Sequence, residues 1–473
     1  MNRVEYKPRE YAGVAQAHML SQPRCGAWFG MGMGKTSMSL FALDTYRLGY
    51  GSAPRTLVLG PKRVAKNVWP AEVAKWKGLE WMRVSPIMGD QHERKAALMR
   101  DADLYTINYE NIQWLIKELD GSWPFDMVIA DESTKLKSFR GGWRTNKTSG
   151  KTHYARGGGA RAAELGSIAH RTKYWMNLTG TPAPNGLEDL WGQTWFLDFG
   201  KRLGNSYTAF TNRWFRMKPG SAREQAIFEP LPNAHDEIMG AIKDLHLTLD
   251  PYDYFDVERP RFVPVKCELT AAQTKQYKEL HRESVLPLLS GQDIFAPNAG
   301  AKINKCLQYA SGCVLDEDGT VHHIHDHKLE ALDSVLEELN SAPVIVTYWY
   351  KHDLVRLKAR YPKGRVLDDK KSTEDAWNSG TIPILFVHPA SASHGLSLQY
   401  GGHNMVMFTP TFDLELFDQV IERIGPVRQA QAGFKRLTNV YLLVTEGTWD
   451  QPVFNRLSLK TTVQESIKEA MKL

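Results

Sequence analysis

Short apolar runs recur along the first half of the chain, and a polar turn and a stretch with helical spacing follow each of them. The stretches between the runs, such as 37–46 and 64–76, place apolar residues on one face of a helix. Strands that alternate with helices in this way are typical of a parallel sheet covered by helices. The predicted strands lie at 27–29, 56–61, 104–107, 125–131 and 175–178.

The second half of the chain repeats this alternation after an interruption. Residues 186–249 are rich in aromatic and apolar positions at helical spacing, which predicts a helical insertion there. We expect a hinge at 251–264, where prolines and aromatic residues gather. Strands are then predicted at 261–265, 343–348, 382–387 and 405–408, and helices at 270–287, 329–339 and from 351.

Two such series indicate two α/β lobes, each a mostly parallel sheet flanked by helices, with a helical insertion between or on them. The length of 473 residues is sufficient for about two or three domains. We assign 1–215 to the first lobe, 190–260 to a helical protrusion and hinge that overlap its end, 261–450 to the second lobe and 451–473 to a helical tail.

The composition is that of an ordinary globular protein, with 42% hydrophobic and 24% charged residues. No apolar run approaches the ~20 residues of a membrane-spanning helix, and the start of the chain lacks the apolar core of a signal peptide. We therefore expect a cytoplasmic protein with no membrane partner. The four cysteines lack metal-ligand spacing, and the histidines at 322–327 have no second ligand cluster nearby, so we expect no metal centre there.

The positive charge is concentrated in one segment. The net charge is +6, yet residues 133–163 contain eight lysines and arginines and no acidic residue, so the remainder sums to about −2 (6 minus 8). A basic, glycine-rich, flexible loop at 135–161 can follow the phosphates of a nucleic acid; a solvated loop without a partner is the alternative. The candidate contacts are Lys137, Arg140, Arg144, Lys147, Lys151, Arg156 and Arg161.

A glycine-rich stretch lies between the first predicted strand and the first predicted helix. Its glycines allow backbone N–H groups to turn inward around anionic oxygens, and the following helix N-terminus adds a positive dipole. Lys35 can reach the β- and γ-phosphates of a nucleotide, and Thr36 can place its hydroxyl on Mg²⁺. Phe29 occupies the position at which such a loop usually begins with glycine. The stretch reads Gly30-Met31-Gly32-Met33-Gly34-Lys35-Thr36.

Two further groups of polar residues come directly after apolar runs. Asp131 and Glu132 end the run 125–131, and the carboxyl ends of parallel strands are where α/β sheets bind ligands. Asp131 can hold Mg²⁺ through water, and Glu132 can polarise the attacking water. The run 175–178 leads into Thr179-Gly180-Thr181, a hydroxyl-rich turn that can sense a γ-phosphate. Together these residues predict a site for phosphoryl transfer.

In this order, the motifs resemble those of superfamily 2 helicases (DEAD/DEAH-type), and within them the Snf2-like translocases on double-stranded DNA. The resemblance covers nearly the whole chain. Residues 30–36 resemble motif I, 56–62 motif Ia with Lys62 as a nucleic-acid contact, 131–137 motif II and 178–185 motif III. The aromatic run after 190 is similar to the Snf2 helical protrusion. In the second lobe, 344–348 resembles motif IV, 395–399 motif V and 419–429 motif VI.

The resemblance implies two RecA-like lobes that bind ATP and Mg²⁺ between them. It assigns catalytic roles to Lys35, Glu132 and Arg423, a nucleotide contact to Gln429, and coupling roles to Thr179, Gly180, Thr181 and Gly395. Pro426 stands where the family has its second arginine, so Arg428, two residues further on, is the candidate for that charge; if Arg428 does not supply it, Arg423 acts alone and turnover should be weaker.

The implied function is a nucleic-acid-stimulated ATPase that moves along, or remodels, duplex or branched DNA, with RNA the less favoured partner. A strand-separating helicase on DNA or RNA shares every ATPase motif and is one alternative. A nucleic-acid-binding switch with weak hydrolysis is another. The compact chain is more typical of a phage or bacterial protein than of a chromatin remodeller, which places it with the nucleoid of a bacterial or phage-infected cell.

Overall fold

The structure, a computed structural model, describes residues 3–145, 149–218, 228–284, 297–316, 318–368, 370–392, 396–411 and 413–457. They form two compact units, the first mainly from residues up to 216 together with 230–254, and the second mainly from residues after 255. No helix within these ranges is long and apolar enough to cross a membrane. Each unit is built around one parallel sheet, so the predicted α/β class is confirmed.

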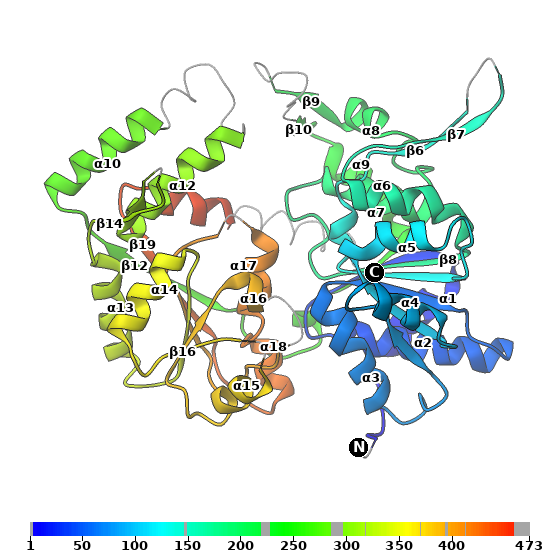
Figure 1. The fold of residues 1–473 in the computed structure, drawn as a ribbon, viewed down its shortest axis with the longest axis horizontal. Coiled ribbons are helices and arrows are strands. Elements are labelled where there is room, and N and C mark those ends of the chain that lie inside the picture. Colours follow the sequence, from blue (N-terminus) through cyan, green and yellow to red (C-terminus); the bar gives the residue numbers. More distant parts are fainter. Residues whose placement is uncertain are drawn as a thin grey trace. The chain divides into compact units, whose positions relative to one another are not determined.

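The first unit contains a seven-stranded sheet in the order β11-β1-β8-β5-β2-β4-β3. All its strand pairs are parallel. The central strands are buried along their whole length because helices cover both faces, which explains their continuous apolar runs (Figure 1). The strands are β1 (Arg24–Phe29), β2 (Thr56–Gly60), β3 (Val84–Pro86), β4 (Leu104–Asn108), β5 (Met127–Asp131), β8 (Tyr174–Thr179) and β11 (His246–Leu249).

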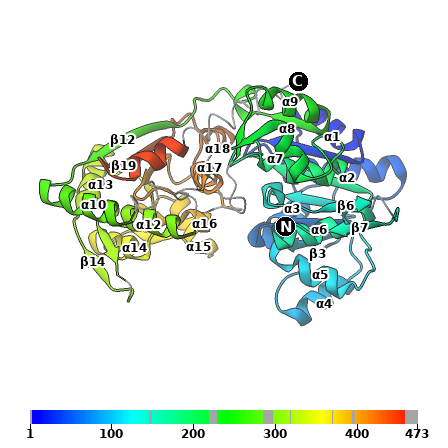
Figure 2. The same ribbon diagram turned by 90° about the horizontal axis from the view of Figure 1, so that it is seen from above.

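Most helices of the first unit lie where the sequence predicts them. Figure 2 shows the same unit from above, with α1 and α2 close together. A five-residue π-helical segment at Val64–Val68 precedes α3. The helices are α1 (Ala12–Ser21), α2 (Lys35–Tyr50), α3 (Trp69–Lys75), α4 (Gln91–Met99), α5 (Ile112–Glu118), α6 (Ala160–Ile168), α7 (Asp189–Asp198), α8 (Tyr207–Trp214) and α9 (Ala234–Ile242).

The prediction of a helical segment at 186–249 is wrong at 215–217 and 228–230, which form two short strands, and again at its end. The last four residues form β11, which pairs with β1 in the register Gly26↔His246 and Phe29↔Leu249. A side chain at Gly26 would overlap the His246 ring, so the strand can pack here only because Gly26 has none. Pairing with a strand more than 200 residues away leaves no local pattern from which β11 could be predicted.

The prediction of a flexible loop at 135–161 is also wrong. Strands β6 (Gly142–Thr145) and β7 (Thr152–Ala155) pair antiparallel and extend away from α6 and α7 (Figure 1). We call residues 139–145 and 149–158 the β6–β7 ribbon, because an isolated antiparallel bridge between Phe139 and Gly158 extends the pairing of the two strands. The glycines at 157–159 allow close backbone packing at its base rather than mobility.

The second unit contains a six-stranded sheet in the order β12-β19-β18-β15-β17-β16, again all parallel. Its strands are β12 (Arg261–Cys267), β15 (Val344–Thr347), β16 (Arg365–Val366), β17 (Ile384–Val387), β18 (Asn404–Met407) and β19 (Asn439–Thr445). Its helices are α10 (Ala271–Ser284), α12 (Pro297–Ser311), α13 (His327–Glu338), α14 (Lys351–Arg360), α15 (Lys371–Asn378), α16 (Pro389–Ala392), α17 (Leu414–Ile421) and α18 (Pro426–Gln431).

Two small strand pairs complete the described structure. They are β9 (Phe215–Met217) with β10 (Phe228–Pro230), and β13 (Cys313–Leu315) with β14 (Val321–His323). The predicted helical tail at 451–473 lies mostly outside the described residues.

Candidate active site

The polar residues predicted from three separate motifs meet at one edge of the first sheet. β8 pairs with β1 on one side and with β5 on the other, and the register places Trp28 beside Thr179 and Asp131 beside Leu178. Because all three strands are parallel, the residues that follow them leave the sheet at its carboxyl edge. The tertiary fold therefore brings the glycine-rich loop, Asp131 and the 179–181 turn together.

The glycine-rich loop needs its glycines for two different reasons. Gly32 and Gly34 have φ angles of 78° and 79°, a left-handed conformation that other residues adopt at a cost. Gly30 is needed because a side chain there would overlap Pro251, which follows β11. Gly34 caps α2 without a side-chain hydrogen bond, so the N–H groups of the first helical turn face an anion site.

Lys35 reaches back across the loop. Its Nζ lies 3.0 Å from the Phe29 carbonyl oxygen and 3.5 Å from that of Gly30. Tyr11 supports the loop from α1's start, because its hydroxyl donates to the Met33 carbonyl at 3.1 Å. The ammonium is thus held on the loop itself, where phosphate oxygens can replace backbone carbonyls as its partners.

Asp131 is buried at the end of β5, and its carboxylate accepts a 2.9 Å hydrogen bond from the Trp69 indole N–H. Burial raises the pKa of Asp131 above its ordinary value, while the Trp69 hydrogen bond and the Lys35 charge oppose that rise. Trp69 is not among the residues predicted from the sequence. Its position on α3, one helix after β2, carries no pattern that points to Asp131.

Glu132 has a left-handed backbone with φ 57° and ψ 58°, which is unusual for a residue other than glycine. Such a conformation costs on the order of 1–3 kcal/mol and persists only where the surroundings impose it. It turns the chain sharply at the end of β5 and starts a short 3₁₀ helix at Ser133. The strain lies at the residue that we predict to be the catalytic base.

Gln193, on α7, connects the residues after β5 with the turn after β8. Its Oε1 accepts from the Ser133 hydroxyl at 3.0 Å, and its Nε2 donates to the carbonyls of Pro182 at 2.6 Å and Asp189 at 3.0 Å. Gln193 is buried, and so are its partners. Gln193 was not predicted from the sequence either, because it lies within an aromatic run that predicts only core packing.

The 179–181 turn packs directly on the glycine-rich loop. Gly180 lies against Met31 and the Phe29 carbonyl, and the Thr181 N–H donates to the Thr179 hydroxyl at 3.1 Å. The Thr181 hydroxyl is buried and has no hydrogen-bond partner among the described residues. An orphaned buried hydroxyl beside the loop fits a site whose ligand supplies the missing partner.

A triphosphate with Mg²⁺ fits this edge by the chemistry of its donors. The α2 N-terminus and Lys35 offer positive groups, Thr36 and Asp131 offer oxygen ligands of the kind Mg²⁺ prefers, and Thr181 offers an unsatisfied hydroxyl.

In the second unit, the two arginines of the motif VI resemblance come together. Arg423 Nη1 and Arg428 Nη1 donate to the same acceptor, the Leu396 carbonyl, at 3.3 Å and 3.1 Å. Burial lowers the pKa of Arg428, and the nearby charges of Glu422 and Glu374 oppose that change. Pro426 begins α18, and this short helix turns Arg428 back toward Arg423.

Gln429 has a structural environment. It is fully buried, and its Nε2 donates to the carbonyls of Gln399, Gly402 and Ile424. This geometry favours a role in holding α18 against the segment that precedes β18 over the predicted nucleotide contact. The predicted coupling residue Gly395 lies outside the described residues.

The predicted nucleic-acid contacts fall into three groups. Arg156 and Arg161 form ion pairs with Glu164 and Glu110, and Arg140 stacks over the Tyr207 ring at 3.6 Å. Lys147 lies outside the described residues. The others are Lys62, Arg144 and Lys151, which are exposed, and Lys137, which is half-buried.

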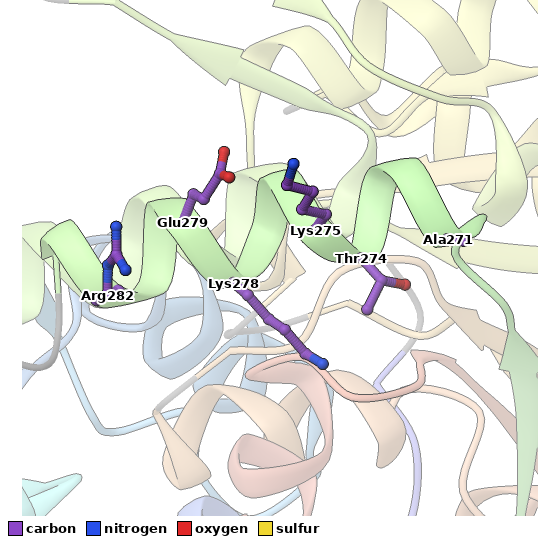
Figure 3. Close-up of a pocket in the computed structure, with 6 residues that line it drawn as sticks. All are labelled: Ala271, Thr274, Lys275, Lys278, Glu279 and Arg282. Atoms are coloured by element: carbon purple, nitrogen blue, oxygen red, sulfur yellow. The ribbon is translucent and has the colours of Figure 1, made fainter.

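Two other features of the second unit carry no part of this site. A surface pocket on α10 is lined by residues of mixed charge, among which Lys275 and Glu279 point to the same side (Figure 3). His325 and His327 stack with ring centroids 4.6 Å apart, and burial lowers the pKa of His325 to about 3. No group of metal-ligating side chains is found in the part of the chain that the structure describes.

The fold and the site define an ATPase with a phosphate-binding loop at the edge of a parallel sheet. Residues 29–311, more than half of the chain, match the SNF2-related domain. The chain therefore belongs to the SNF2-related family and is a Snf2-like ATP hydrolase of the nucleic-acid-stimulated class in helicase superfamily 2. The predicted family and enzyme class are confirmed.

The proteins to which this chain is similar differ in sequence identity and in the share of each chain that the match covers. It is 44% identical over 470 residues to protein p41 of Acyrthosiphon pisum secondary endosymbiont phage 1, a match that covers 99% of each chain. It is 23% identical over 479 residues to the Mus musculus SWI/SNF-related matrix-associated actin-dependent regulator of chromatin subfamily A member 1, covering 91% of this chain but 40% of that protein. The Sulfolobus solfataricus SWI2/SNF2 ATPase core in complex with dsDNA is 18% identical, with a TM-score of 0.42 and coverage of 98% and 93%.

Proposed function

We propose that this protein is an ATP-driven translocase that moves along or remodels duplex or branched DNA in the cytoplasm of a bacterial or phage-infected cell. The observation that carries the proposal is the meeting of the glycine-rich loop, Asp131 and the 179–181 turn at one sheet edge. A phage relative over the whole chain supports the setting, and the match to the SNF2-related domain supports a nucleic acid as the partner.

The first unit supplies the groups that bind and activate ATP. The N–H groups at the start of α2 and the Lys35 ammonium bind the phosphates. Thr36 and Asp131 would hold Mg²⁺, which when bound neutralises charge on the phosphate oxygens. Glu132 accepts a proton from the attacking water, and its left-handed backbone places it at the sharp turn that ends β5.

The second unit supplies positive charge. Arg423 and Arg428 share the Leu396 carbonyl, so two guanidinium groups lie close enough to act on one developing anion. We assign to this pair the stabilisation of charge on the transferred phosphoryl group. Arg428 thereby replaces the arginine that Pro426 cannot provide.

The proposal is tested by steady-state ATP hydrolysis with no nucleic acid, single-stranded DNA, duplex DNA, a four-way DNA junction and RNA. Duplex DNA or the four-way junction should stimulate ATP hydrolysis more than single-stranded DNA or RNA does. Stimulation by RNA alone would refute the DNA translocase, and hydrolysis that no nucleic acid changes would favour the switch with weak hydrolysis.

Two substitutions test the site itself. Lys35→Ala and Glu132→Gln should each abolish turnover, and Glu132→Gln should still bind ATP because it leaves the loop intact. Lys117→Ala, at an exposed lysine of α5, is the control and should keep full activity. Wild-type turnover in either site variant would contradict the assignment.

A further inference from the structure

The β6–β7 ribbon is anchored firmly at its base. Phe139 is fully buried and packs against three aromatic rings of α7, with centroid distances of 5.8 Å to Trp191, 4.5 Å to Trp195 and 5.0 Å to Phe196. A buried phenylalanine of this kind contributes about 1.5–3 kcal/mol through apolar burial. The direction in which the ribbon leaves the first unit is therefore set by core packing.

The backbone at the base is packed closely as well. Arg140 N–H donates to the Gly157 carbonyl at 3.0 Å, and Gly159 N–H donates to the Ser138 carbonyl at 3.0 Å. Gly158 has φ 80°, and a side chain there would overlap the Ser138 carbonyl. The glycines at 157–159 thus allow the two strands to pack closely at the base of the ribbon, against residues 138–140.

The two faces of the ribbon differ in chemistry. Trp143 lies opposite Tyr154, and the indole also contacts the His170 ring at 4.6 Å, so this face is turned toward the unit. Arg144 lies opposite His153, and because strand side chains alternate, this pair occupies the other face. Arg144 and His153 are both exposed. The outward face is basic and polar.

Two basic side chains of the ribbon are available to a partner. Arg156 is paired with Glu164, and Arg140 is stacked on Tyr207. Within the described part of the chain, neither Arg144 nor Lys151 has a carboxylate partner, and both are exposed. Since residues 133–163 contain no acidic residue, nothing in the ribbon itself competes for an anion.

We propose that the β6–β7 ribbon is a DNA-binding element separate from the ATPase site. Its face that carries Arg144 lies along the phosphates that border a groove of duplex DNA. A two-stranded ribbon has the width that the major groove of B-DNA admits, about 12 Å. The choice of a duplex over a single strand rests on this match in width; Trp143 is exposed and contacts Tyr154 and His170 on the other face of the ribbon. The inference rests on the proposed function, since it takes duplex DNA as the partner.

The test compares the full-length protein with a double variant, Arg144→Glu with Lys151→Glu. Binding to a fluorescent 30-base-pair duplex and to a single strand of equal length is measured by anisotropy across a series of salt concentrations, without nucleotide. A second double variant, Arg144→Ala with Lys151→Ala, removes the charges without adding repulsion. The control is Arg100→Glu with Lys117→Glu, which makes the same charge change at exposed positions beyond the ribbon.

Loss of two phosphate contacts should lower the slope of log affinity against log salt by about 1.8, since each contact contributes about 0.9 for B-DNA. The alanine variant should weaken duplex affinity about tenfold near 0.1 M salt, with more loss for the glutamate variant and DNA-free ATP hydrolysis unchanged in both. Unchanged duplex affinity, or an equal loss in the control, would overturn the inference. Loss confined to the single strand would overturn the choice of duplex.

Failure of the ribbon and failure of the proposed function are distinguishable. If duplex DNA stimulates hydrolysis by the wild-type protein while the ribbon variants bind DNA normally, only the ribbon inference fails. If DNA neither binds nor stimulates the wild-type protein, the proposed function fails.

Discussion

Replacement of Gln193 by leucine removes the connection between the two sides of the active-site edge while keeping nearly the same volume. The wild-type amide makes hydrogen bonds to the Ser133 hydroxyl and to the carbonyls of Pro182 and Asp189. Leucine leaves Ser133 and Pro182 without these partners in a buried environment. Each buried polar group left unsatisfied costs about 1–3 kcal/mol, so with two such groups we expect the free energy of unfolding to fall by about 2–6 kcal/mol.

The neighbouring residue provides a matched control. Thr194 is buried on the same helix, and its hydroxyl has no hydrogen-bond partner among the described residues. Thr194→Val removes that hydroxyl at similar volume. Because no hydrogen bond is lost and an unsatisfied polar group leaves the interior, the free energy of unfolding should stay the same or rise.

Both variants are measured by urea-induced unfolding, followed by far-ultraviolet circular dichroism and tryptophan fluorescence. The two units can unfold in separate transitions, so the comparison uses the transition that Gln193→Leu shifts. Hydrolysis by Gln193→Leu should also fall at saturating ATP, since Ser133 directly follows Glu132, which we propose as the catalytic base. Equal stability of Gln193→Leu and Thr194→Val would refute the reasoning.

Two further substitutions test single contacts of the site. Trp69→Phe removes the N–H that donates to Asp131, so the pKa of this carboxyl should rise further and the acid limb of the hydrolysis profile should move to higher pH. Because the pKa of Asp131 in the folded state is above 3.8, its ionised form lowers the free energy of unfolding, and protonation on acidification should restore it. If Trp69→Phe leaves the acid limb of the hydrolysis profile unmoved, the role assigned to the Trp69 hydrogen bond is contradicted. Arg423→Ala and Arg428→Ala should each lower turnover on the order of 10³-fold with ATP affinity retained, as for arginines that stabilise phosphoryl-transfer charge. Near-normal turnover of Arg428→Ala, compared with Arg365→Ala as an exposed control in the same unit, would show that Arg428 is not the second arginine.

Local patterns predicted the central strands well. The runs that became β2, β4 and β5 are short, apolar and bounded by turns, and the parallel sheet buries them on both faces. The pattern failed for β11, whose pairing with β1 depends on the missing side chain of Gly26. It also failed for the β6–β7 ribbon, where glycines that suggest mobility serve close backbone packing.

The same division holds within the site. Lys35, Asp131 and Glu132 could be predicted because each follows a strand in a short motif whose chemistry is local. Trp69 and Gln193 could not be predicted, because each acts on a residue about 60 positions away through a side-chain hydrogen bond.

The sequence by itself determined the central strands and the helices between them, the phosphate-binding loop and the family, because these depend on neighbouring residues and on apolar periodicity. Only the tertiary structure decided which strand ends share an edge, that Arg428 and Arg423 share the Leu396 carbonyl, and that the basic segment is a ribbon. These features depend on packing between residues distant in the chain, and no local pattern encodes such contacts.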